Sequence, residues 1–124
     1  MTGKFRVGII DDHPLFREGL ATVLNSHGRF EVSHSYAGAA EARALGRDQF
    51  PDLFIVDIEL KGESGLDFVR RCAQMSPTPK VLVLSMHEEH YYGERALRAG
   101  AVGYLNKMTP PDQIVDQVLR ACQG

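Results

Sequence analysis

The sequence lacks any long hydrophobic run. Its apolar stretches are far shorter than the roughly 20 consecutive apolar residues that a membrane-spanning helix needs. The opening segment, MTGKFRVGII, leads at once into a strand-like run, without the longer apolar segment and small-residue cleavage site of a signal peptide. We therefore expect a cytoplasmic protein that has no contact with a membrane.

The sequence is also poor in cysteine and in excess charge. Cys72 and Cys122 belong to no CxxC pair and both lie in helical patterns, so we expect free thiols and no metal site or redox motif at them. A total of 14 basic against 16 acidic residues gives a net charge of −2, which provides no overall attraction to nucleic acid. Because repeats, low-complexity tracts and internal linkers are missing, residues 1–124 are expected to form one domain.

Five short apolar runs are present, and they predict five strands. The first, third and fourth are hydrophobic nearly throughout and do not alternate with polar residues. Such runs are typical of parallel strands that helices cover on both faces. The predicted strands are Phe5–Ile10, Phe30–Ser33, Leu53–Val56, Val81–Leu84 and Gly103–Leu105.

Helical patterns separate the predicted strands. The first pattern has apolar residues at i, i+4, i+7 and i+8 from Phe16 to Leu24, and Pro14 suits its first turn. Thr109 is expected to cap the last helix, and Gly28 and Gly100 are expected at C-terminal caps. The other predicted helices are Ala39–Leu45, Leu66–Met75, Glu88–Ala99 and Pro110–Cys122.

Alternating strands and helices with short connections predict an α/β fold, a doubly wound five-stranded parallel sheet flanked by five helices. Ligands bind such sheets beyond the carboxyl ends of the strands. Five polar residues fall at that edge, each just after a predicted strand: Asp11, Asp12, Asp57, Ser85 and Lys107.

These five residues suit the transfer of a phosphoryl group. Carboxylates that meet at one edge repel each other unless a cation holds them, and their oxygens are the ligands that Mg²⁺ prefers. Lys107 and Ser85 can contact charged oxygens, which would allow Asp57 to accept a phosphoryl group covalently. Alone, each residue is explained as a turn residue, a helix cap or a surface charge. The ordered set of five favours the phosphoryl-transfer site.

Over essentially the whole chain, the residues resemble the receiver domain of two-component response regulators, which implies the flavodoxin-like strand order 2-1-3-4-5. The segments DDHPLFREGL and ALRAGAVGYLNK are similar to the NarL/FixJ (LuxR-type) subfamily. The resemblance implies that Mg²⁺ is held by the acid pair, the acceptor and a backbone carbonyl, and that a sensor histidine kinase donates the phosphoryl group. Its implied site residues are Asp11, Asp12, Asp57 (acceptor), Glu59 (carbonyl ligand), Ser85 (switch), Tyr104 (switch) and Lys107.

The resemblance also implies what surrounds the site. Members of the subfamily usually carry a helix-turn-helix DNA-binding domain after the receiver, so DNA would be bound only through a domain that these residues do not include. Phosphorylation is expected to draw Ser85 inward, to turn Tyr104 and to control dimerisation. Glu59 and His87, two residues beyond Asp57 and Ser85, are expected to tune the lifetime of the phosphoryl group.

Two positions depart from the pattern of the family. Lys61 stands where a proline often follows the acceptor, although Gly65 keeps the later glycine. Met108 stands where a proline, commonly with a cis bond, often follows the lysine. Because a cis bond before a non-proline residue costs about 2.5 to 4 kcal/mol, we expect a trans bond between Lys107 and Met108.

Three other functions are compatible with the fold. A flavodoxin-type carrier would need a phosphate-cradling first loop, but Asp11 and Asp12 would repel an anion. A haloacid-dehalogenase-like phosphatase uses two aspartates spaced by one residue, whereas these two are adjacent. A receiver-shaped interaction module that binds partners without being phosphorylated is the nearest alternative, and loss of the acid pair, the acceptor or the lysine would favour it.

Overall fold

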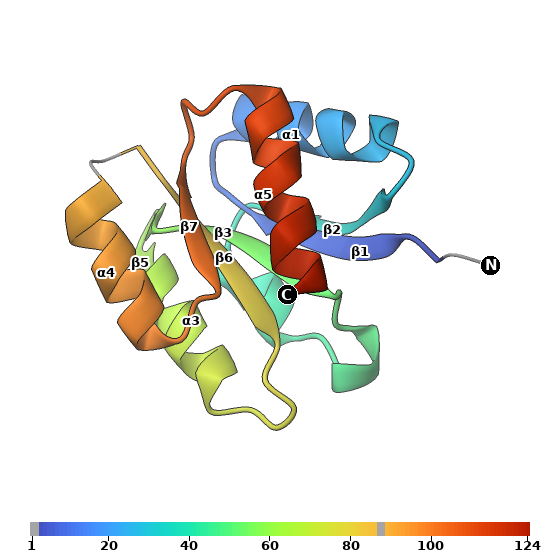
Figure 1. Ribbon diagram of the computed structural model, residues 1–124. Coiled ribbons are helices and arrows are strands. Elements are labelled where there is room, and N and C mark those ends of the chain that lie inside the picture. The colour runs from blue at the N-terminus through green and yellow to red at the C-terminus, as the bar shows by residue number, and fades with distance from the viewer. Residues whose placement is uncertain (1–2, 87–88) are drawn as a thin grey trace.

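The computed structural model describes residues 3–86 and 89–124. Strands and helices alternate along most of this part of the chain, as the sequence predicts, and five of its strands form the main sheet (Figure 1). The sheet strands are β1 (Phe5–Ile10), β2 (Phe30–Tyr36), β3 (Leu53–Asp57), β6 (Lys80–Ser85) and β7 (Gly103–Asn106). The helices are α1 (Pro14–Ser26), α2 (Ala39–Arg43), α3 (Gly65–Ala73), α4 (Glu89–Ala99) and α5 (Pro111–Gln123), with a 3-10 turn at Arg47–Gln49.

The sheet is parallel throughout and has the order β2-β1-β3-β6-β7. This is the predicted flavodoxin-like order, with β6 and β7 as the fourth and fifth strands of the sheet. A second sheet was not predicted: β4 (Glu59–Leu60) and β5 (Glu63–Ser64) form a short antiparallel hairpin directly after β3.

Alternate residues of each central strand enter different cores, which explains why the strands are hydrophobic without alternation. Leu53 and Ile55 of β3 pack with α1 and α5, whereas Phe54 and Val56 pack with α2, α3 and α4. Figure 1 shows the sheet between these two groups of helices. All four side chains are fully buried, and each such side chain contributes about 1.5 to 3 kcal/mol to the stability of the fold.

Two predicted caps are wrong. Helix α5 begins at Pro111 behind Pro110, which has no side-chain capping bond, so Thr109 lies outside the helix and its N–H donates to Asn106 O instead. Helix α1 ends at Ser26 with His27 in extended conformation, so no left-handed residue is needed at Gly28. The third predicted cap is confirmed, because Gly100 follows α4 with φ +119°.

The elements end within two residues of their predicted bounds, except that β2 continues three residues beyond its predicted end, to Tyr36. Helix α2 stops at Arg43, and the chain turns at Gly46 into the 3-10 helix. The Gln49 side chain accepts the N–H of Gly46, and the Gln49 N–H donates to Gly46 O. These local bonds end α2 before Leu45.

Among the described residues, none of the helices has the length and apolar character to cross a membrane.

Candidate functional site

The predicted site residues meet at the carboxyl edge of the sheet. Asp57 ends β3, Ser85 ends β6, and Asp11 and Lys107 directly follow β1 and β7. Because β3 pairs with β6 in a register that places Asp57 opposite Leu84, Ser85 lies one residue beyond the acid on the next strand. The parallel strands therefore bring side chains that are far apart in sequence into one pocket.

A buried lysine joins two buried acids in this pocket. Lys107 Nζ lies 2.7 Å from Asp11 Oδ2 and 3.2 Å from Asp57 Oδ2, and the ring centroid of Phe16 lies 4.9 Å from the same nitrogen. The side chains of Asp11, Asp57 and Lys107 are 0%, 4% and 4% exposed. Charged side chains are rarely buried to this extent unless they are paired, and here Lys107 pairs with both acids.

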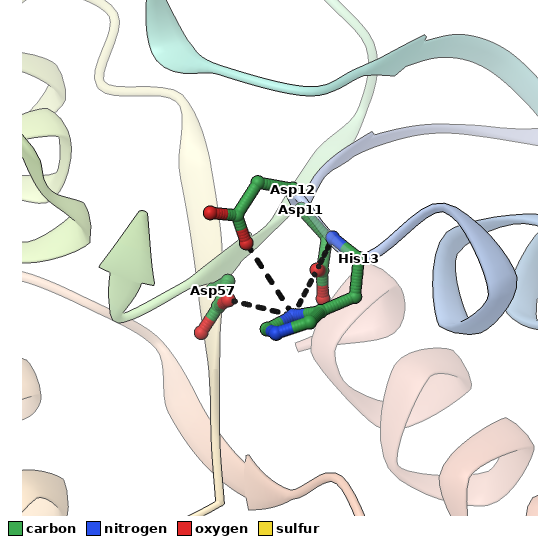
Figure 2. A group of neighbouring side chains, drawn as sticks. All are labelled: Asp11, Asp12, His13 and Asp57. Atoms are coloured by element: carbon green, nitrogen blue, oxygen red, sulfur yellow. Dashed lines mark hydrogen bonds and ion pairs between the residues drawn. The ribbon is translucent and has the colours of Figure 1, made fainter. Parts of the chain in front are cut away.

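His13 occupies the space between the three acids (Figure 2). Its Nδ1 lies 3.0 Å from Asp11 Oδ1, 3.4 Å from Asp12 Oδ1 and 3.6 Å from Asp57 Oδ2. The same nitrogen lies 3.0 Å from Lys107 Nζ, while the side chain as a whole is 61% exposed. His13 was not predicted as a site residue, and its place directly after the acid pair is the one signal for it in the sequence.

The environment of Asp57 raises the pKa of its carboxyl group. Burial is the largest cause, because it penalises the charged form, and the charge of Asp11 acts in the same direction. The N–H of Glu59, which donates to Asp57 Oδ1 at 3.1 Å, and the ammonium of Lys107 oppose the increase. The carboxylate thus lies in a pocket where additional positive charge would stabilise it.

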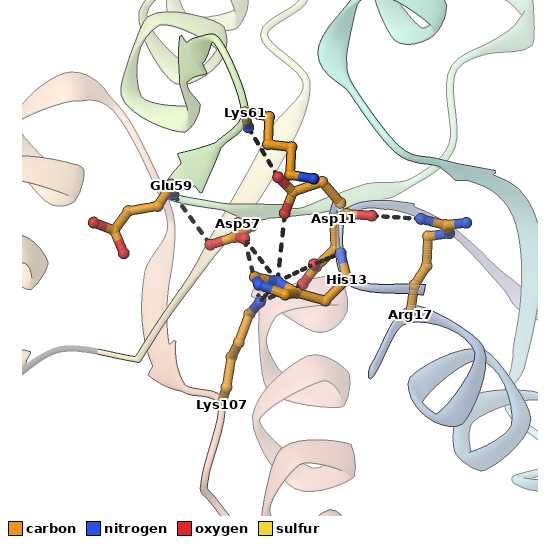
Figure 3. A network of polar contacts seen from close by, with 8 residues as sticks. Asp11, His13, Arg17, Asp57, Glu59, Lys61 and Lys107 are labelled. Carbon is orange, nitrogen blue, oxygen red and sulfur yellow. Dashed lines mark hydrogen bonds and ion pairs between the residues drawn. The ribbon is translucent and has the colours of Figure 1, made fainter. Parts of the chain in front are cut away.

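Backbone and side-chain donors fix the loop that carries the acid pair (Figure 3). Arg17 Nη1 donates to the carbonyl of Asp11 at 2.6 Å, and the N–H of His13 donates to Asp11 Oδ1 at 2.8 Å. The N–H of Lys61, at the tip of the β4–β5 hairpin, donates to Asp12 Oδ2 at 2.9 Å. The sequence pattern pointed neither to Arg17 nor to this amide.

The pocket fits a hard divalent cation. Asp11, Asp12, His13 and Asp57 each offer a ligand atom, and these atoms all lie within 4.8 Å of one another. Asp12 Oδ1 is buried and accepts no hydrogen bond, and Asp11 Oδ2 has only the ion pair with Lys107. Oxygens that are buried, negative and short of donors are suitable ligands for Mg²⁺, which takes one or two carboxylates and keeps several waters.

The residues with predicted switching or tuning roles lie around this pocket. Ser85 is buried, and Tyr104 on β7 is 36% exposed, with its ring against α4 at Gly93. Figure 3 shows the carboxylate of Glu59 pointing away from His13, although the backbone of Glu59 contacts the acceptor. His87 lies outside the described residues. As expected, the Lys107–Met108 bond is trans, since the one cis bond of the described chain precedes Pro77.

Gly65 is required by the backbone next to the acceptor. A Cβ at this position would lie 2.8 Å from the Cα of Ile58 and would collide with the carbonyl oxygen of Asp57. The N–H of Gly65 donates to Ile58 O at 2.9 Å, so the start of α3 lies directly against the end of β3. A side chain here would displace the backbone that carries Asp57.

An apolar groove borders the pocket. It has a volume of about 400 Å³ and runs between α1 and α5, with Lys107 in its lining. The side chains of Leu15 and Met108 line it and are 89% and 74% exposed. Contiguous exposed apolar surface beside polar residues marks sites of protein interaction, so the groove is a candidate contact for a protein partner.

Comparisons with known proteins agree with this geometry. Residues 7–119 match the family described as response regulator receiver domain. The chain is 36% identical over 121 residues to "Transcriptional regulatory protein DegU" of Brevibacillus brevis, and 33% identical over 124 residues to "Nitrate/nitrite response regulator protein homolog" of Haemophilus influenzae. It covers 51% and 60% of these proteins, and they cover 98% and 100% of it.

A solved structure shows the same fold. It is a two-component response regulator of the LuxR family from Aurantimonas sp., with a TM-score of 0.90 and 30% identity over 98% of this chain and 87% of that chain. The chain spans about half the length of the curated relatives that it matches.

Proposed function

This chain belongs to the response regulator receiver domain family, and on that premise we propose that Asp57 accepts a phosphoryl group in a reaction that requires Mg²⁺. The observation that carries the proposal is the buried lysine: Lys107 Nζ contacts both Asp11 and Asp57 where burial otherwise disfavours the charges. A structural role alone would not require three carboxylates and an ammonium group in one pocket.

The roles of the residues follow from their contacts. A carboxylate oxygen of Asp57 attacks phosphorus, and the bond between phosphorus and the donor breaks as the new bond forms. Lys107 lies close enough to Asp57 Oδ2 to pair with a phosphoryl oxygen that is attached there. Asp11, Asp12, Asp57 and the carbonyl of Glu59 would hold Mg²⁺. When bound, the ion would supply positive charge next to the incoming dianion.

The phosphoryl donor is proposed to be a sensor histidine kinase that docks on the groove between α1 and α5. Leu15 and Met108 would enter an apolar surface of the kinase, which would place its phosphohistidine next to Lys107.

Two curated relatives are named a transcriptional regulatory protein and a response regulator protein. The effector is therefore proposed to be a DNA-binding domain in the remainder of a longer cytoplasmic protein.

The output of the site is proposed to be a two-state switch. A phosphoryl group on Asp57 would accept a hydrogen bond from the hydroxyl of Ser85 and draw Ser85 inward, which would allow Tyr104 to turn from an exposed to a buried rotamer and would favour dimerisation. Glu59 and His87 are proposed to tune the slow autodephosphorylation that resets the domain.

Intact-mass measurement after treatment with acetyl phosphate tests the proposal. One phosphoryl group should be added in the presence of Mg²⁺, and none with EDTA or in Asp57→Asn. Asp116→Asn, which changes an exposed acid on α5, is the matched control and should be modified like the wild type. Modification of Asp57→Asn would overturn the assignment, and absence of modification in every sample would favour a phosphorylation-independent interaction module.

A further inference from the structure

We propose that the backbone N–H of Lys61 is a positioning group for the metal site, which aims one carboxylate oxygen of Asp12 at the cation. The inference rests on the proposed function, because it concerns the Mg²⁺ that the site would hold. The contact is the hydrogen bond from Lys61 N to Asp12 Oδ2, 2.9 Å long, which joins residues 49 positions apart. Figure 3 shows this bond at the edge of the pocket.

The two oxygens of Asp12 are in different environments. Oδ2 accepts the N–H of Lys61, whereas Oδ1 is buried, accepts no hydrogen bond and lies 3.4 Å from His13 Nδ1, between the acids. The terminal torsion of an aspartate is broad, so its carboxylate turns freely without a partner. A donor that holds Oδ2 therefore fixes the direction of Oδ1. Partners of metal ligands commonly act in this way, and their loss typically weakens metal binding by 10-fold to 100-fold.

The hairpin holds the donor in place. Strands β4 and β5 pair Leu60 with Glu63, which leaves Lys61 and Gly62 as its two-residue tip. Leu60 is 6% exposed and belongs to the core beneath α3, and the N–H of Gly65 donates to Ile58 O at the base. The tip therefore cannot move away from Asp12 without disturbing the core.

The amide, and not the ammonium group, makes this contact. Every residue except proline provides a backbone N–H, and this is the position where the family resemblance leads one to expect proline. Gly62 has φ +74° and Lys61 has a negative φ, the combination of a type II turn, in which proline is common at the first central position. The preceding residue, Leu60, is in a strand and tolerates a following proline. Lys61→Pro should therefore keep the turn and remove only the donor.

The test is the dissociation constant of Mg²⁺, measured by isothermal titration calorimetry without a phosphodonor. Lys61→Pro should bind Mg²⁺ about 10-fold more weakly than the wild type. Lys61→Ala, which loses the ammonium group but keeps the N–H, should differ by less than about twofold, because an exposed charge contributes little. Circular dichroism melts of each variant establish that it is folded.

A double-mutant cycle separates positioning from a general disturbance of the loop. In an Asp12→Ala background, Lys61→Pro should cost nothing further, because the carboxylate that the amide positions is gone. A similar loss of affinity in that background, or equal affinities of Lys61→Pro and the wild type, would overturn the inference. Phosphorylation of Asp57 in the mass assay would show that the proposed function survives such a result.

Discussion

Replacement of Lys107 by methionine removes the ammonium group that contacts both buried acids. Lys107 Nζ lies 2.7 Å from Asp11 Oδ2 and 3.2 Å from Asp57 Oδ2, and all three side chains are almost completely buried. Removal of one partner from a buried ion pair costs about 3 to 5 kcal/mol, because the remaining charge is uncompensated. The backbone N–H groups of His13 and Glu59 still donate to Asp11 and Asp57, so we expect a loss at the lower end of this range, about 3 kcal/mol, for the metal-free protein.

Mg²⁺ should reverse about half of this loss. A cation in the pocket replaces the missing positive charge, and it should bind more tightly when Lys107 no longer competes for the same oxygens. At saturation the difference in the free energy of unfolding between Lys107→Met and the wild type changes by about 1.4 kcal/mol for every tenfold difference between their dissociation constants for Mg²⁺. If Mg²⁺ binds Lys107→Met about tenfold more tightly, the difference of about 3 kcal/mol in EDTA should fall to about half in saturating Mg²⁺.

Urea unfolding followed by circular dichroism measures these differences. The matched control is Lys80→Met, which removes a lysine at the start of β6 whose Nζ donates to Cys122 O at 3.0 Å. This variant should lose about 1 kcal/mol, and by the same amount with and without Mg²⁺. An equal cost of Lys107→Met in both conditions, or no cost in EDTA, would refute the account of the pocket.

Three further predictions concern neighbouring side chains. Because burial raises the pKa of Asp57, protonation of its carboxyl group contributes to the free energy of unfolding. This contribution is present below about pH 4 and is lost as pH rises through the raised pKa. The stability of metal-free Asp57→Asn relative to the wild type should therefore increase with pH in urea melts, and a pH-independent difference would contradict this cause. His13→Ala should bind Mg²⁺ up to about fivefold more tightly in calorimetry, since the ring stands between the acids and the contacts of an exposed side chain with them are worth at most about 1 kcal/mol; weaker binding would make His13 a ligand. Ser85→Ala should still accept the phosphoryl group but lose most of the phosphorylation-dependent change in sedimentation, because the missing hydrogen bond shifts the switch roughly tenfold to hundredfold; a full response would rule out Ser85 as the coupling residue.

Much of the fold could be predicted because the sheet is buried on both faces. The run from Leu53 to Val56 is hydrophobic without a break, and the structure places its side chains alternately in the two cores. The edge strand β2, which extends to Tyr36, was predicted too short because its second half is polar and only partly buried. Thr109 was assigned as a cap from its type alone, whereas the two prolines after it determine where α5 begins.

The position of the pocket could be predicted, but the contacts inside it could not. Parallel topology is sufficient to bring Asp11, Asp57 and Lys107 to one edge of the sheet. The place of His13 depends on a side-chain torsion, and the contact of Lys61 with Asp12 depends on a hairpin of two-residue strands, too short for an alternating pattern to reveal. Neither property is encoded in the periodicity of the sequence.

Asp57 is proposed to be the acceptor, and its modification is proposed to require Mg²⁺. Borohydride reduces an aspartyl phosphate to homoserine, so reduction followed by peptide sequencing in a mass spectrometer locates the acceptor directly. After treatment with acetyl phosphate and Mg²⁺, homoserine should be found at position 57 and should be missing from the sample with EDTA. Homoserine at position 11 or 12, or its formation without Mg²⁺, would contradict the account.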